Sequence, residues 1–67
     1  MKQLDLHNLR HEQVHNKVED FILLNEQPCS IITGNSAKMQ EIVIEVIKQH
    51  DMKYVIYAHN LGEIIVL

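Results

Sequence analysis

The sequence predicts an α+β fold in which two helices cover one face of a four-stranded mixed sheet, a two-layer βαβαββ sandwich. QLDLH at 3–7 alternates apolar and polar residues, as a half-buried strand does. The apolar residues that follow recur every three or four positions, which is typical of an amphipathic helix. Two further strand-like segments, SIIT at 30–33 and KYVIYA at 53–58, enclose a second helical pattern, and EIIVL at 63–67 closes the chain.

The first helix is expected over residues 10–25 and ends at Gln27-Pro28, because proline lacks the N–H group that a helix interior needs. The second helix follows the sharp turn 34–36, where Ser36 can cap its first turn, and runs to about His50. The apolar stripes of the two helices are Val14, Val18, Phe21 and Ile22, then Met39, Ile42, Val43, Val46 and Ile47.

The last two strands are predicted to form a hairpin through residues 59–62, because Asn60 and Gly62 tolerate positive φ. Parallel crossovers are right-handed, so two crossovers that travel in one direction place both helices on the same face. The third strand is then parallel to the first two, the last strand is antiparallel, and the other face of the sheet is bare.

Composition limits the classes of protein that fit. The 67 residues are predicted to form one domain (1–67), and Cys29 is the sole cysteine, so no disulfide forms within the chain. A lone thiol and the lack of a leader-like or membrane-length apolar segment predict a soluble, cytoplasmic protein with no membrane partner. The formal charge of −3 argues against binding of DNA or RNA through a broad basic surface. Any such contact has to be made by a few local groups.

HEQVH at 11–15 matches H-E-x-x-H, the zinc-protease pattern. A zinc protease also needs a third ligand and a deep peptide cleft, and Glu19 is the nearest acidic candidate in a chain too small to enclose such a cleft. We therefore interpret HEQVH as a helix start and predict neither a metalloprotease nor a resident metal or cofactor.

Three loops are expected at one edge of the sheet: His7-Asn8, the turn 34–36 and the hairpin 59–62. Ligands of open α/β sheets bind at the carboxyl ends of the parallel strands. This edge is therefore the predicted functional site.

LDLHNLRHEQV resembles the L-D-L-H-G opening of the small MutS-related (Smr) domain family. IITGNS resembles the T-G-x-G turn of that family, and NLGEIIVL resembles its glycine-containing hairpin and final strand. The resemblance covers nearly the whole chain, with the motifs in the right order and spacing. The family has a fold similar to the C-terminal domain of translation initiation factor 3, which agrees with the βαβαββ order.

This resemblance implies nucleic-acid binding, with endonuclease activity on DNA or RNA phosphodiesters in several members. The D-x-H element of the family falls on Asp5 and His7. Asn8 replaces the glycine of the first motif, and Ser36 replaces the second glycine of T-G-x-G, so whether catalysis survives is left open. The T-G-x-G element falls on Thr33, Gly34, Asn35 and Ser36.

The chemistry of these residues fits a phosphate ligand. Side chains two apart on a strand share one side, so the Asp5 carboxylate could orient the His7 imidazole as an acid or base; alternatively both are solvated surface residues. A turn that opens a helix offers unpaired N–H groups to an anion. Further phosphate contacts are predicted for Thr33, Ser36, Lys38, Arg10 and His11, and in the hairpin for His59, Asn60 and Gly62.

A rival hypothesis is a protein-interaction or adaptor module that keeps the fold without the chemistry. It is favoured by the negative charge, the altered T-G-x-G turn and the bare sheet face, on which a second copy or a partner protein could pack. Alternatively, Tyr54 or Tyr57 on that face could stack against unpaired bases.

Overall fold

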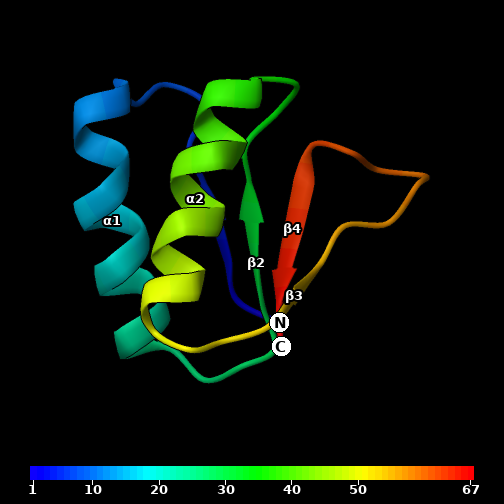
Figure 1. The fold of residues 1–67 in the computed structure, drawn as a ribbon. Helices are drawn as coiled ribbons and strands as arrows, with labels where there is room; N and C mark the ends of the chain where they lie inside the picture. Colours follow the sequence, from blue (N-terminus) through cyan, green and yellow to red (C-terminus); the bar gives the residue numbers. More distant parts are fainter.

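The computed structural model describes all 67 residues as two helices and a four-stranded mixed sheet (Figure 1). The α+β class predicted from the sequence is confirmed. Neither helix is long and apolar enough to cross a membrane. The elements are β1 (Gln3–Asp5), α1 (His11–Leu24), β2 (Cys29–Ile32), α2 (Ala37–Gln49), β3 (Tyr54–Val55) and β4 (Glu63–Val66).

The strands lie in the order β1-β2-β4-β3. β1 is parallel to β2, and β4 is antiparallel to both β2 and β3. β3 therefore runs in the same direction as β1 and β2, as predicted. The last strand lies inside the sheet, so β1 and β3 are its two edges.

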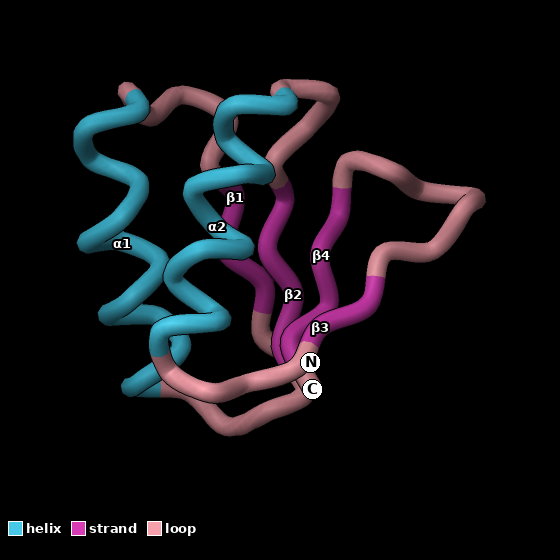
Figure 2. Tube along the Cα trace, viewed as in Figure 1, coloured by secondary structure: helices cyan, strands magenta, loops and turns pink.

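Register assigns the two faces of the sheet. Leu4, Ile31 and Ile64 lie side by side on the three neighbouring strands and face the core. Figures 1 and 2 show both helices side by side on this side of the sheet. The next residue along each strand faces the opposite, open side. The core consists of Leu6, Val14, Val18, Ile22, Cys29, Ile31, Met39, Val43, Val46, Ile47, Ile64 and Val66.

Both helices begin at caps that the sequence encodes. The Arg10 N–H donates to Gln13 Oε1 (3.1 Å) at the start of α1. The Met39 N–H donates to Ser36 Oγ (3.1 Å) at the start of α2, so Ser36 is the N-cap, as predicted. At its other end α1 stops at Leu24, where the Asn25 N–H donates to the Phe21 carbonyl (3.2 Å).

We expect Ser36→Ala to lower the free energy of unfolding by about 1 kcal/mol, because the Met39 N–H loses its acceptor. Urea unfolding followed by circular dichroism measures this change. Ser36→Asp is the matched variant: a carboxylate accepts the same bond and is favoured at the positive end of the helix, so stability is expected to be retained. Equal losses in both variants would contradict the capping role.

Three strands are shorter than predicted: β4 ends one residue early, at Val66, and β1 and β3 lose more. β1 ends at Asp5, and its last bond to β2 runs from the Leu6 N–H to the Ile32 carbonyl (3.0 Å). The Leu6 carbonyl then accepts the Leu9 N–H (3.1 Å), while the Gly34 N–H donates to the Gly62 carbonyl, so the ladder does not continue. β3 covers only Tyr54–Val55, and the predicted hairpin link 59–62 is in fact the longer connection 56–62. That connection contains a tight turn, in which the Asn60 N–H donates to the Tyr57 carbonyl (3.0 Å), and this turn separates the two strands after Val55.

Candidate functional site

The end of β1, the turn after β2 and the residue before β4 meet at one place. The N–H groups of Thr33 and Gly34 both donate to the Gly62 carbonyl, at 2.8 and 3.1 Å. A Cβ atom built on Gly34 would lie 3.9 Å from Cε1 of His7. The three segments that were expected together therefore lie at the same end of the sheet, where the parallel strands β1 and β2 have their carboxyl ends.

Glycine is favoured at both positions of this contact for different reasons. Gly34 has a φ of +66°, in the left-handed region that side chains rarely adopt. A Cβ atom on Gly62 would lie 3.1 Å from the Gly34 Cα and 3.3 Å from its carbonyl carbon and oxygen. The two glycines let the turn and the β4 connection approach each other closely.

Asp5 and His7 form the pair that the spacing predicts. His7 Nδ1 lies 3.7 Å from Asp5 Oδ1, and both side chains are largely exposed. This separation is too long for a hydrogen bond, but the carboxylate attracts the imidazole when the ring is protonated. Nε2 of His7 has no hydrogen-bond partner, so it is free to meet a ligand.

A hollow of about 500 Å³ adjoins His7 and the first turn of α2. The free N–H groups and the positive dipole end of a helix favour an anion at such a place. His11, at the start of α1, adds a second imidazole to the wall. The hollow is lined by His7, Leu9, His11, Thr33, Gly34, Asn35, Ser36 and Met39.

Thr33 lines the hollow but does not offer its hydroxyl to a ligand. Its side chain is buried, and Oγ1 donates to the carbonyls of Gly34 (3.0 Å) and Gly62 (3.3 Å). Thr33 therefore holds the turn against the β4 connection. Its predicted role as a phosphate contact stays a prediction, and in this structure its hydroxyl is bonded within the protein.

Several predicted contact residues lie outside the hollow. Asn8 lines a neighbouring depression with Asp5 and Lys17, while Arg10 and Lys38 are exposed and border neither. His59 stacks on Tyr57 with ring centroids 5.6 Å apart. The tight turn carries the tip of the 56–62 connection away from α2 and β1 (Figure 2). Of the hairpin residues, Gly62 alone reaches the site, through its carbonyl; Asn60 donates to Glu63 Oε1 (3.4 Å).

Gln40 does not line the hollow beside His7 but supports the Gly34 turn, a contact that the sequence did not predict. Its Nε2 donates to the Leu61 carbonyl (2.6 Å) and the Gly34 carbonyl (3.3 Å). It therefore ties α2 to both the turn and the β4 connection. The available signal was a long amide side chain one helical turn after the cap residue, beside the apolar stripe.

The two histidines of HEQVH, His11 and His15, have different surroundings. His11 borders the hollow, whereas His15 Nε2 lies 3.3 Å from Gln49 Oε1 on α2. Glu19, the acidic residue nearest to the pattern, lies 2.9 Å from His50 Nε2 and joins the far ends of the two helices. No three His, Cys, Asp or Glu side chains are grouped where they could hold a metal ion.

Cys29 is in the core, where burial raises the pKa of its thiol. We expect it to react slowly with a thiol reagent at pH 8 in the native protein and rapidly in urea. The folded thiol keeps its proton to higher pH than the unfolded one, so its contribution to stability is full below about pH 8.5 and is lost as the pH rises through the folded pKa. Cys29→Val is expected to remove that decline, which urea unfolding at pH 7 to 10 measures.

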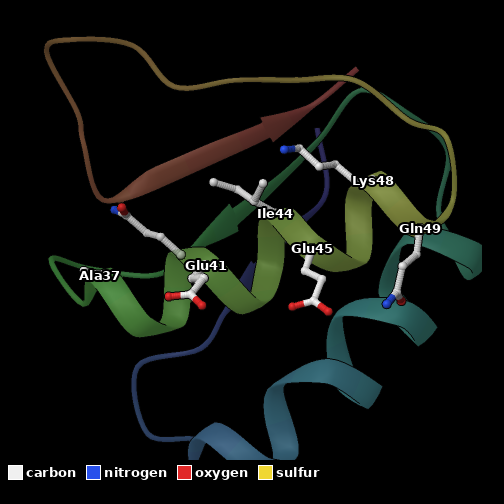
Figure 3. A pocket seen from close by; sticks show the side chains of 7 residues that line it. Ala37, Glu41, Ile44, Glu45, Lys48 and Gln49 are labelled. Carbon is white, nitrogen blue, oxygen red and sulfur yellow. The ribbon is translucent and has the colours of Figure 1, made fainter.

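The largest hollow lies elsewhere, on the outer surface of α2 (Figure 3). Glu41, Glu45 and Lys48 provide its charges, and Ile44 lies between them. Two carboxylates repel an anionic ligand, and the hollow contains no imidazole, although Ala37 at the start of α2 is one of its lining residues. The smaller hollow beside His7 is therefore the better candidate for a phosphate ligand.

Fold and site together define a small α+β domain with a hollow at the carboxyl ends of its parallel strands. Comparisons with protein-family models, with curated proteins and with solved structures find no match. The resemblance to the Smr family therefore depends on the sequence motifs alone.

Proposed function

We propose that the protein is an Smr-like domain that binds nucleic acid, with a backbone phosphate in the hollow beside His7. The observation that carries the proposal is that His7 and the Gly34 turn line the same hollow, with His7 Cε1 3.9 Å from the position that a Cβ atom on Gly34 would take. This contact brings an imidazole to the amide-rich start of α2. Because the formal charge is −3, binding depends on a few local groups and not on a basic surface.

Endonuclease activity is the further step of this proposal. Asp5 lies on the Nδ1 side of His7, which leaves Nε2 to donate or accept a proton at a phosphodiester oxygen. His11 supplies a second imidazole in the same hollow. Asp5 then acts as a positioning residue and His7 as the acid or base.

The second candidate is a protein-interaction module, and the open sheet face favours it. Ile32, Val55 and Ile65 lie on this face, opposite the helices. Ile32 and Val55 remain partly exposed, and no helix covers them. Such a module would bind a protein partner on the open face and would make no use of the hollow beside His7.

The two candidates are separated by incubating the protein with labelled single-stranded RNA, structured RNA and duplex DNA, with and without a chelator. We expect His7→Ala to weaken binding about tenfold, because a charge-assisted hydrogen bond is worth about 1.5–3 kcal/mol, and to abolish any cutting. His59→Ala is the matched control, since His59 lies outside the hollow, and is expected to have no effect. Binding that His7→Ala leaves unchanged would contradict the site, and neither binding nor cutting would favour the interaction module.

A further inference from the structure

The two edge strands of the sheet, β1 and β3, differ in which backbone N–H and C=O groups are left without a partner. On the β3 side, the Leu67 N–H donates to the Lys53 carbonyl (2.8 Å), so Lys53 and the second residue after it, Val55, turn their backbone groups to β4. Tyr54 and Ile56 therefore turn their N–H and C=O groups away from the sheet. Both side chains pack against the core, which shows that the alternation continues through Ile56.

The β1 edge is closed by its own side chains. The Asp5 carboxylate accepts the His7 N–H (2.9 Å), and charged side chains stand directly before the strand at Lys2 and at its last residue, Asp5. Charged side chains are a usual protection of a free edge. The stretch 54–57 of the β3 edge has no charge and no proline. β3 is thus the edge that remains open to another strand.

We propose that β3 pairs with β3 of a second copy of this chain, antiparallel across a two-fold axis that passes through the sheet at Val55. Tyr54 then lies opposite Ile56 of the partner subunit, and the two residues exchange both N–H···O bonds. Val55 lies opposite Val55 of the partner subunit. The result is one continuous eight-stranded sheet.

A second copy fits this edge better than another partner because the edge is complementary to itself. The outward backbone groups at 54 and 56 have the same spacing in both copies, so each finds a partner. Residues opposite each other in an antiparallel pair point to the same face of the sheet. Residues on the helix side therefore lie opposite residues on the helix side, and Val55 lies opposite the partner's Val55 on the open face. A two-fold contact also closes after two copies, whereas pairing of β3 with β1 would continue without end.

This interface leaves the hollow beside His7 free, because β1 and the start of α2 are not part of it. Dimer formation and nucleic-acid binding are therefore independent properties. Either can fail without the other.

The register is tested by changing the residue on the axis. Val55→Lys places two like charges opposite each other, as does Val55→Glu, and each variant alone is expected to weaken dimerisation about tenfold or more in sedimentation velocity. An equimolar mixture of the two variants is expected to regain dimers, because lysine then faces glutamate. Leu67→Lys, on an exposed residue outside the pairing stretch, is the control and leaves the dimer intact.

Far-UV circular dichroism checks that each variant is folded. Amide exchange gives a second readout that needs no substitution: the Tyr54 and Ile56 N–H groups are protected at high protein concentration and exchange quickly on dilution. A chain that stays monomeric at about millimolar concentration overturns the proposal. So does a dimer that Val55→Lys leaves unchanged, or a mixture of the two charged variants that stays monomeric.

Discussion

Ile31→Ala is expected to lower the free energy of unfolding by about 3–4 kcal/mol. Ile31 is fully buried in β2, between its register partners Leu4 on β1 and Ile64 on β4. Removing three carbon atoms there leaves a cavity that two neighbouring strands and two helices cannot close without breaking their own contacts. A domain of this length has a total stability of about 3–10 kcal/mol, so the variant is expected to be largely unfolded near 50 °C. Urea and thermal unfolding measure the loss.

Ile32→Ala is the matched control, because it is the same substitution one residue further along the strand. Ile32 faces the open side and is partly exposed, so the expected loss is below about 1.5 kcal/mol. Equal losses at the two positions would contradict the assignment of the faces. A larger loss at Ile32 would show that a further layer covers the open face in solution.

The helices could be predicted closely because their signals are local. Ser36 caps α2, and the apolar positions that define its stripe are spaced by the helix itself. α1 was predicted over 10–25 and is observed at His11–Leu24, a difference of one residue at each end. Each of these boundaries is set by groups within about four residues of it.

The strands depended on contacts that the local sequence does not encode. KYVIYA has the same preference for extended structure whether two or six of its residues pair, and the turn at Tyr57 and Asn60 ended the pairing. At the other edge, β1 stopped early because the Leu6 carbonyl accepts the Leu9 N–H in a turn, while the Gly34 N–H donates to the Gly62 carbonyl. In both cases a turn used backbone groups that a longer ladder would have paired.

The site was predictable where backbone chemistry defines it and unpredictable where side chains cross between elements. The turn 34–36, His7 and His11 came together as expected, because strand ends and a helix start are fixed by topology. Gln40 was missed, since its two bonds to the Gly34 and Leu61 carbonyls depend on the path of the 56–62 connection. The same path carried His59 away from the hollow.

Gly62→Ala is expected to disturb the candidate site more directly than any change within its walls. The added Cβ atom would lie 3.1 Å from the Gly34 Cα and 3.3 Å from its carbonyl group, and these are backbone atoms that no rotamer change can move. The turn or the β4 connection has to shift, which weakens the bonds from the Thr33 and Gly34 N–H groups to the Gly62 carbonyl. We expect a loss of about 1–3 kcal/mol in the free energy of unfolding.

The same shift separates the Gly34 turn from the His7 ring, so the proposed affinity for nucleic acid is expected to fall in the folded protein. Amide chemical shifts of Gly34 and His7, recorded below the unfolding transition, distinguish this local change from loss of the fold. Ala58→Val adds bulk at an exposed position of the same connection and is expected to change neither stability nor affinity. If Gly62→Ala kept both the wild-type stability and the wild-type affinity, the close approach of the two glycines would not be what brings His7 and the start of α2 into one site.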